Sequence, residues 1–313
     1  MSARPARILC AGIAVHDHVF KLEFFPPAGA KKRAEDFVAV GGGCAANAAV
    51  AVARLGGEAA LASPLGGPQG ADRIGDWILE DLAREGVDSR RVVRVDGAVS
   101  PISAILVDGP GERLIVNHRD ERLSAARIAD PDAAIAGFDA LLADNRFADF
   151  VLPLCHAARK LNLPVVLDGD RPTVASDALL TACTHLVFAA DGLRATAGCD
   201  DLSEALRTIA ARTDAFVSVT NGDQGVLWLE GEGLQHMPAI PVQVIDTLGA
   251  GDVFHGAFVL ALAEGRRIEE ALAFATLGAA VKCTRFGGIA GAPRREEVLR
   301  LQAERGLPLA AKS

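Results

Sequence analysis

The sequence predicts an α/β fold: a doubly wound, mainly parallel sheet with helices on both faces and a small β flap at its edge. Short apolar runs of strand length alternate with helical patterns along most of the chain. The 313 residues are 50% apolar and only 23% charged, which is enough to bury a large core. No linker or low-complexity tract divides the chain, so we expect residues 1–313 to form a single domain.

The expected core strands are short apolar runs. They lie at residues 8–15, 59–62, 140–143, 165–167, 185–188 and 216–220. Patterns with helical spacing separate them, at residues 44–55, 71–85, 147–161 and 202–212. Three more helices are expected near the C-terminus, at residues 250–264, 268–283 and 294–304. Strands that alternate with helices favour parallel pairing, because each crossover helix returns the chain to the same edge of the sheet.

Two segments break this alternation. Residues 19–40 mix charged and apolar residues around the run PPAG at 26–29. Residues 102–117 have the chemistry of a hairpin, with two β-rich runs on either side of DGPGE at 108–112. Strands without intervening helices do not fit inside a doubly wound sheet. We therefore expect segments at about 19–40 and 98–118 to form a small flap that covers a site.

Composition and charge exclude several function classes. The net charge of −8, the absence of Tyr and the presence of only two Trp oppose a nucleic-acid-binding surface. The six Cys form no CxxC pair, which opposes a zinc site and a disulfide framework. The apolar run near the N-terminus is too short for a secretion signal, and no run reaches the length of a membrane span. We expect a cytoplasmic protein that binds neither nucleic acid nor membrane.

The strongest functional signal is the run DTLGAGDVFHG at residues 246–256, which opens a long helix. Gly249 and Gly251 permit a tight turn, so that their N–H groups and that of Ala250 can point at one anion. Asp252 then lies in the first helical turn. Bound phosphate repels a neighbouring carboxylate, which favours a role for Asp252 in orienting and deprotonating an attacking hydroxyl. The alternative is that Asp252 only caps the helix.

A second glycine run, GGGCAANAAVAVARLG at residues 41–56, matches the dinucleotide fingerprint through Gly41, Gly43 and Ala46. That interpretation would make the protein an NAD-dependent oxidoreductase. The fingerprint should follow the first core strand, whereas this run follows the expected flap, and no acidic residue stands at the right distance to bind the ribose. The other interpretation is that small residues here allow a helix to pack closely on the sheet.

Gly42-Gly43 with Asn47 and AVARLG, together with DTLGAGDVFHGAF, resemble the two signature regions of the PfkB, or ribokinase-like, carbohydrate kinases. The similarity covers nearly the whole chain, and no GxxxxGK[ST] phosphate loop is present. The resemblance implies a ribokinase-like, three-layer fold with a β lid. It also implies an ATP- and Mg²⁺-dependent kinase that transfers the γ-phosphate to a primary hydroxyl of a ketose-type sugar.

The resemblance further implies roles for individual residues. Asp252 would be the general base, with Gly249, Ala250 and Gly251 as the anion hole. Asp246 would support this loop and help to arrange a site for a monovalent cation such as K⁺. The sugar-binding residues would be Asp17, Gly42, Gly43 and Asn47, and the nucleotide-contacting turn would comprise Thr220, Gly222 and Gly225. The β lid would be the interface of a homodimer.

Within the family, the chain is most similar to sulfofructose kinases, in stretches such as GERLIVN, VLDGD and VKCTRFGGIAG. This similarity implies 6-deoxy-6-sulfofructose as the substrate. Lys31, Asn117 and Arg146 match the positions that contact the sulfonate, and their donors suit an anion. Each has another interpretation: Lys31 as part of a solvated charge run, Asn117 as a hairpin end, Arg146 as a partner of Asp144 or Asp149. A neutral sugar, fructose or ribose, and an aldulosonate are the alternative substrates.

Asp168 and Asp170 end an expected strand at the edge where doubly wound sheets bind ligands. They could shape the site, handle Mg²⁺-ATP or cap the next element, and the sequence does not separate these roles. His255 follows Asp252 by three residues and lies on the same helix face. The seven His show no spacing typical of a metal site.

Overall fold

The computed structural model describes residues 4–109, 112–173 and 177–305. Its core is an eight-stranded sheet with the strand order β14-β13-β12-β11-β10-β9-β1-β4. In that order the strands are Gly233–Met237, Val226–Glu230, Phe216–Thr220, His185–Ala189, Val165–Gly169, Ala140–Asp144, Arg7–Ala11 and Glu58–Ala62. The strands from β12 to β4 pair in parallel, whereas β13 and β14 are antiparallel. The predicted mainly parallel sheet is confirmed.

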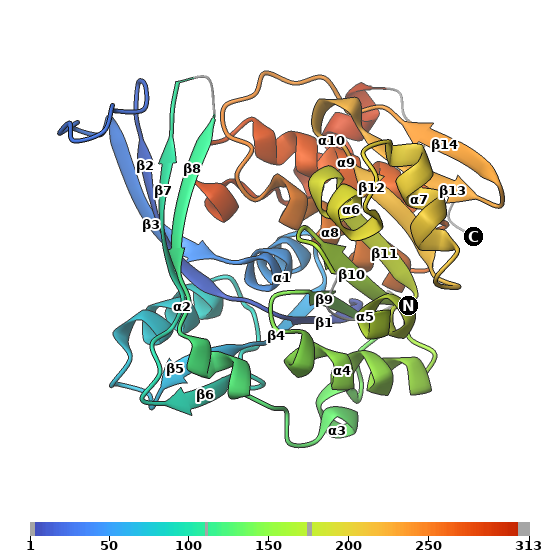
Figure 1. The fold of residues 1–313 in the computed structure, drawn as a ribbon, viewed down its shortest axis with the longest axis horizontal. Helices are drawn as coiled ribbons and strands as arrows, with labels where there is room; N and C mark the ends of the chain where they lie inside the picture. Colours follow the sequence, from blue (N-terminus) through green and yellow to red (C-terminus); the bar gives the residue numbers. More distant parts are fainter. Residues whose placement is uncertain (1–3, 110–111, 174–176, 306–313) are drawn as a thin grey trace.

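Helices cover both faces of this sheet (Figure 1). Alternate residues of β1 show the two sides: Ile8 and Cys10 join one apolar cluster, and Leu9 and Ala11 join the other. The first cluster packs under α1 (Cys44–Arg54), α2 (Arg73–Arg84), α8 (Ala250–Ala263), α9 (Ile268–Cys283) and α10 (Arg295–Glu304). The second packs under α3 (Pro131–Ile135), α4 (Ala148–Lys160), α5 (Asp177–Ala182), α6 (Ala190–Ala197) and α7 (Leu202–Ala210). The fold is therefore three layers.

A second sheet of four strands stands beside the core, at the left of Figure 1. Its order is β3-β2-β7-β8, with bounds Asp36–Gly42, Val15–Lys21, Ile102–Val107 and Arg113–His118. β7 and β8 form the predicted hairpin, although Pro110 and Gly111 of its turn lie outside the described residues. One face of this small sheet packs Val19, Ile105 and Val107 against Leu248 and Phe286. This face thus contacts the segment that precedes α8.

Several elements differ from the sequence prediction. The strand expected at residues 8–15 is two strands, because β1 ends at Ala11 and the chain crosses into β2 of the small sheet at Val15. Gly12 marks the break: a side chain there would overlap the carboxylate of Asp144. The short parallel pair β5 (Pro64–Gly67) and β6 (Val93–Asp96) was not predicted, nor was the antiparallel pair β13 and β14. β5 (PLGG), β6 (VRVD) and β14 (GLQHM) lack the apolar runs that reveal buried strands, whereas β13 contains such a run, VLWL, and was missed.

Candidate functional site

The run DTLGAGD forms a tight turn into α8. Gly249 is the residue before the helix and has φ of 79°, a left-handed conformation that glycine adopts without strain. Gly251 is exposed, and a side-chain carbon built on it would meet nothing within 4 Å. The N–H of Ala250 donates to the carbonyl of Thr247 at 3.2 Å, so this amide is already engaged. At Gly251 the start of α8 therefore faces open space, as an anion site requires.

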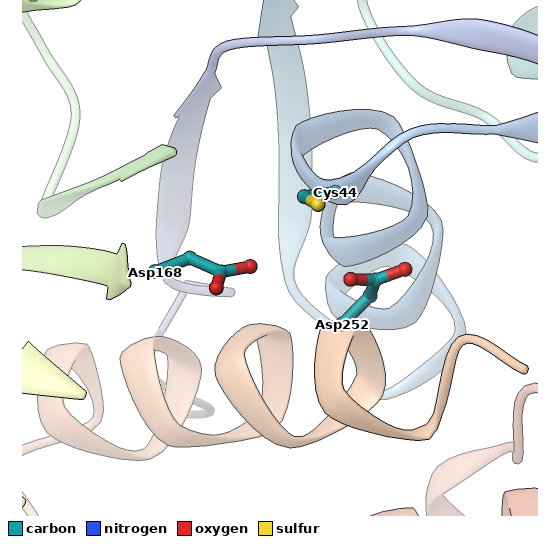
Figure 2. A group of neighbouring side chains, drawn as sticks. All are labelled: Cys44, Asp168 and Asp252. Carbon is teal, nitrogen blue, oxygen red and sulfur yellow. The ribbon is translucent and has the colours of Figure 1, made fainter. Parts of the chain in front are cut away.

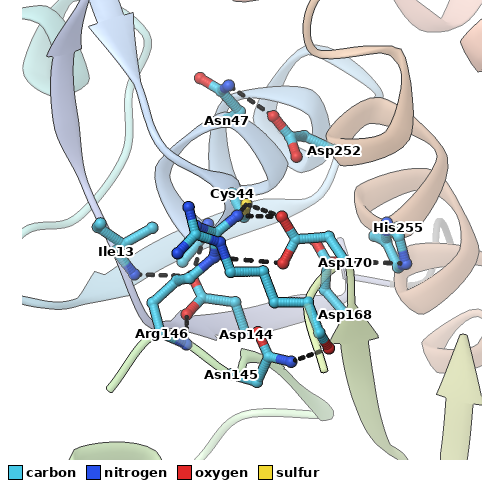
Figure 3. A network of polar contacts seen from close by, with 12 residues as sticks. Ile13, Cys44, Asn47, Asp144, Asn145, Arg146, Asp168, Asp170, Asp252 and His255 are labelled. Carbon is cyan, nitrogen blue, oxygen red and sulfur yellow. Dashed lines mark hydrogen bonds and ion pairs between the residues drawn. The ribbon is translucent and has the colours of Figure 1, made fainter. Parts of the chain in front are cut away.

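Asp252 lies in this first turn and is held by Asn47 of α1. The Nδ2 of Asn47 donates to Oδ2 of Asp252 over 2.6 Å (Figure 3). The Oδ1 of Asn47 is buried and has no hydrogen-bond partner among the residues that the structure describes. Burial raises the pKa of Asp252, while the bond from Asn47 opposes the shift. A raised pKa makes this carboxylate a stronger base.

The predicted sugar residues Asp17, Gly42 and Gly43 lie where the small sheet joins α1. Asp17 is buried in β2, and burial raises its pKa to about 6, opposed by a hydrogen bond with Ser103. A side chain at Gly42 would overlap the carboxylate of Asp17, so glycine is needed there. Gly43 has φ of 90° and begins α1. The structure brings these residues and Asn47 to one place.

Asp144 joins three elements at the carboxyl edge of the large sheet. Its carboxylate accepts the N–H groups of Ile13 at 2.7 Å, Ala45 at 3.2 Å and Arg146 at 2.9 Å. Burial raises the pKa of Asp144 to about 6, and these backbone bonds oppose the shift. Asp144 therefore fixes the starts of β2 and α1 relative to β9 (Figure 3).

Asp168 and Asp170 have separate environments. Asp170 forms an ion pair with Arg146, whose Nε lies 3.2 Å from Oδ1 of Asp170. Asp168 is buried, and within the described part of the chain its Oδ1 has no hydrogen-bond partner. Ligand atoms of Asp168, Cys44 and Asp252 lie within 4.8 Å of one another (Figure 2). Burial raises the pKa of Asp168 and of the Cys44 thiol.

His255 links α8 to the sheet. Its Nδ1 lies 2.7 Å from the carbonyl of Gly251, and its Nε2 lies 3.1 Å from the carbonyl of Val187. Both ring nitrogens face acceptors, and Nε2 is also 3.6 Å from Oδ1 of Asp168. Burial opposes the charged ring, but Asp168 and the two carbonyls raise the pKa of His255. The sequence indicated only that this side chain shares a helix face with Asp252.

The three residues matched to a sulfonate are only partly brought together. Asp17, Ser103 and Asn117 are directly paired across β2, β7 and β8, so their side chains share the face of the small sheet that points toward the site. Arg119, just beyond β8, donates to the carbonyl of Arg146 at 2.7 Å. Asn117 therefore lies on the same side as Arg146.

Lys31 is placed differently. It is exposed in the loop between β2 and β3, at the end of the small sheet opposite Gly42. A strand of this length spans about 20 Å. Within one chain, Lys31 therefore does not join Asn117 and Arg146.

Arg146 is part of a cationic cluster that sequence reasoning missed. Burial lowers the pKa of Arg171, and the nearby charges of Arg146 and Arg119 lower it further, while the charge of Asp170 opposes the shift. Three guanidinium groups thus lie within electrostatic range of one another. Arg146 precedes α4, Arg119 follows β8 and Arg171 follows β10. No periodic pattern or motif marks these positions in the sequence. The alternative that Arg146 pairs with Asp144 through its side chain is wrong, since the partner is Asp170.

Asp246 is fully buried beneath the loop. Its Oδ1 accepts the N–H of Leu248 at 2.8 Å, and its Oδ2 accepts those of Gly287 and Gly288 at 3.0 and 3.1 Å. The Nζ of Lys282 lies 3.0 Å from the carbonyl oxygen of Asp246. A lysine within the apolar pattern of α9 was the available signal for this contact, and it was overlooked.

The predicted nucleotide turn follows β12, whose carboxyl end lies at the same edge as those of β10 and β11. Thr220 ends this strand, and its hydroxyl donates to the carbonyl of Phe188. Gly222 and Gly225 have φ of 54° and 87°. A side chain at Gly225 would meet the backbone of residues 237–239, whereas Gly222 has nothing within 4 Å. Gly225 is thus required for folding, and Gly222 leaves open space.

Comparisons with known proteins show which proteins this chain resembles. The model of the family described as pfkB family carbohydrate kinase matches residues 5–295. The ribokinase of Bacillus subtilis (strain 168) is 31% identical over 278 residues, covering 87% of this chain and 91% of that protein. The fructokinase-1 of Oryza sativa subsp. japonica is 27% identical, covering 90% and 94%.

Solved structures give the same result. A candidate ribokinase from Agrobacterium tumefaciens has a TM-score of 0.92 and 36% identity, covering 96% of this chain and 98% of that one. The ribokinase of Arabidopsis thaliana, solved with ribose and ATP, has a TM-score of 0.80 and 26% identity, covering 96% and 99%. The predicted ribokinase-like fold is confirmed. Among the described residues, no helix is long and apolar enough to cross a membrane.

The NAD-dependent oxidoreductase interpretation is wrong. The fingerprint run follows β3 of the small sheet rather than a strand of the parallel sheet, so α1 does not begin a dinucleotide-binding βαβ unit. The small residues of the run serve packing instead: Ala48 and Ala51 of α1 lie so close to Gly256 of α8 that a side chain there would clash. Family, relatives and topology all favour the kinase.

Proposed function

The chain belongs to the pfkB family of carbohydrate kinases, and we propose that it transfers the γ-phosphate of ATP to a primary hydroxyl of a ketose sugar, with Asp252 as the general base. The observation that carries this proposal is the position of Asp252 in the first turn of α8, held by Asn47 over 2.6 Å. An ATP-dependent carbohydrate kinase needs a base beside the phosphate, and this carboxylate has a raised pKa.

In the proposed mechanism, the sugar lies between the small sheet and α8. The reacting hydroxyl donates to Asp252, and the hydrogen bond from Asn47 orients this carboxylate. Asp17, fixed against Gly42, accepts another hydroxyl. Asp252 takes the proton as the oxygen attacks, while amides of the turn at Gly249 and Gly251 stabilise the developing charge.

Asp168 is the proposed ligand for Mg²⁺ carried by ATP, because oxygen is the ligand type that Mg²⁺ prefers. Burial raises the pKa of Asp168, so Mg²⁺ would bind with release of the proton from this carboxyl. When bound, Mg²⁺ would neutralise charge on the phosphates. The neighbouring Cys44 is a poor ligand for this ion, because burial raises the pKa of its thiol and Mg²⁺ favours oxygen. The turn at Thr220, Gly222 and Gly225 is proposed to contact the nucleotide.

The cationic cluster supports an anionic ketose, and 6-deoxy-6-sulfofructose is the proposed substrate. Asp170 engages Nε and Nη2 of Arg146, and no hydrogen bond to its Nη1 is found among the described residues. That nitrogen keeps two donors for a sulfonate oxygen. Asn117 can supply a further donor from the site-facing side of the small sheet. A neutral ketose or ribose is the competing substrate, because Asp170 already balances the charge of Arg146 and the relatives named above are ribokinases and a fructokinase.

A substrate panel separates these possibilities. Wild type and the variants Arg146→Ala and Asn117→Leu would be assayed with sulfofructose, fructose, ribose and an aldulosonate in a coupled ADP-release assay. We expect both variants to lower kcat/KM for sulfofructose about 10-fold or more and to change that for fructose about 3-fold or less. Arg127→Ala, an exposed arginine paired with Asp149, is the control. Equal losses with both sugars, or wild-type preference for a neutral sugar, would contradict the sulfonate proposal.

We also propose that the chain forms a homodimer through the outer face of the small sheet. This face presents Phe37, Leu114 and Val116, which are 48%, 51% and 63% exposed. Lys31 contributes to the sulfonate site only if a second copy supplies it, because its own loop points away. Sedimentation should show a dimer for wild type and for Leu161→Glu, and a monomer for Val116→Glu. A monomeric wild type would contradict the proposal.

A further inference from the structure

Lys282 is unusual among the charged residues of this protein. It is the next-to-last residue of α9, and its side chain is 0% exposed. Among residues 4–109, 112–173 and 177–305 it is the only Lys or Arg whose residue is buried. A fully buried ammonium is costly unless oxygen atoms surround it, so its surroundings need an explanation.

Three oxygens surround the Nζ of Lys282. The carbonyl oxygens of Asp246 and Arg285 lie 3.0 and 3.1 Å away, and Oδ2 of Asp246 lies 3.5 Å away. An ammonium group has three N–H donors, which matches this set. Gly291 leaves room for the stem of the lysine, since a side-chain carbon there would come within 3.2 Å of its Cδ. The surroundings therefore match both the donors and the shape of this side chain. We call these residues, Asp246, Arg285 and Gly291, the Lys282 cage.

The cage stands directly beneath the proposed catalytic loop. The same Asp246 carboxylate accepts N–H groups from Leu248 in the loop and from Gly287 and Gly288 in the following turn. That turn lies against Gly249, whose added side-chain carbon would be 3.7 Å from Gly288. The charge of Lys282 thus stabilises the carboxylate that holds the loop and this turn together.

The family resemblance implied a monovalent cation at Asp246. The oxygens that Asp246 could offer such an ion are already engaged: its carbonyl and Oδ2 contact Nζ of Lys282, and Oδ1 accepts the N–H of Leu248. The residues present therefore do not fit a separate K⁺ ion. We propose that Lys282 is a built-in cation that positions the Asp246–Gly251 loop, so that the kinase works without K⁺.

Burial lowers the pKa of Lys282, and the charge of Asp246 opposes this. All three surrounding atoms are acceptors, so the protonated amine is the form that satisfies them. Lys282 is a positioning residue, since it acts through Asp246 and the loop and does not touch the reacting atoms. The inference rests on the proposed role of the loop in phosphoryl transfer.

The test removes the ammonium group of Lys282 and offers K⁺ in its place. The intact wild type and the variants Lys282→Ala and Lys282→Met would be assayed in tetramethylammonium buffer, with KCl added at constant ionic strength. We expect wild-type kcat to change less than about 2-fold. Lys282→Ala should lose about 10-fold or more and regain most of this loss with K⁺, because the cavity can hold the ion. Lys282→Met should lose activity without recovery, because its side chain fills the cage. Lys160→Met, an exposed lysine on α4 paired with Asp132, is the matched control.

Thermal unfolding gives a readout that does not depend on activity. K⁺ should raise the Tm of Lys282→Ala and leave that of wild type and Lys282→Met unchanged beyond the salt control. K⁺-dependent turnover or K⁺-induced stabilisation of wild type would overturn the proposal. Full activity of Lys282→Met without K⁺ would also overturn it. A wild type that phosphorylates no sugar would instead contradict the proposed function, and the Tm measurements would still test the cage.

Discussion

Replacing Asp252 with asparagine tests the proposed base with little change in shape. The side chain keeps its size, and its amide oxygen can still accept a hydrogen bond from Nδ2 of Asn47. In wild type this group donates to Oδ2 of Asp252 over 2.6 Å. What is lost is the negative charge and the ability to take a proton. General-base catalysis contributes about 10² to 10⁴ in rate. A 10²-fold loss corresponds to about 2.7 kcal/mol of transition-state stabilisation. We expect kcat of Asp252→Asn to fall at least this far, with ATP affinity nearly unchanged.

The assay is initial-rate kinetics with a coupled ADP readout, together with calorimetric titration of ATP. Asp191→Asn is the control, because Asp191 also lies in the first turn of a helix but is 98% exposed at its side chain. In wild type, activity should fall as the pH is lowered through the pKa of Asp252, since protonation removes the base. Burial raises that pKa, so the acidic limb should lie above the ordinary aspartate value. Near-normal turnover of Asp252→Asn, or an unchanged acidic limb in that variant, would refute the assignment.

Two further predictions concern the supports of the site. Gly42→Ala should displace the carboxylate of Asp17 and raise KM for the sugar about 10-fold or more, with KM for ATP little changed. Gly41→Ala is the control, because a side-chain carbon there would meet only ordinary van der Waals contacts, and equal effects of the two variants would contradict the prediction. Asp144→Ala should lower the free energy of unfolding by about 2–3 kcal/mol or more, because it leaves three backbone N–H groups without their acceptor. Urea denaturation measures this change. A loss below about 1 kcal/mol, roughly the net contribution of a single hydrogen bond, would argue against Asp144 as the residue that fixes β2 and α1.

Much of the fold followed from local patterns. The apolar runs at 140–143 and 216–220 lie in β9 and β12, and the helix expected at 268–283 has these bounds in the structure. Periods of two and 3.6 residues are set by the backbone, so they are visible in any one stretch of chain. β5 and β6 were not predicted because glycine in PLGG and charged residues in VRVD interrupt the apolar pattern.

The turn before α8 was also predictable. Gly249 adopts a positive φ, and Asp252 follows in the first turn, because these properties depend on residues next to each other in the chain. From the sequence, this run indicated an anion site with a carboxylate beside it. The resemblance of two separated signatures then indicated a sugar kinase, and the family match confirms that activity class.

The partners of these residues were decided only by tertiary structure. Asn47 and Asp252 are 205 residues apart, and Arg146 and Asp170 belong to the ends of two different strands. Lys282 and Asp246 meet because α9 packs its last turn under the loop. Such contacts depend on how helices pack on the sheet, which no local period encodes. The sequence by itself thus determined most of the elements and the glycine turn before α8, whereas packing decided which side chain holds Asp252 and that Lys282 contacts Asp246.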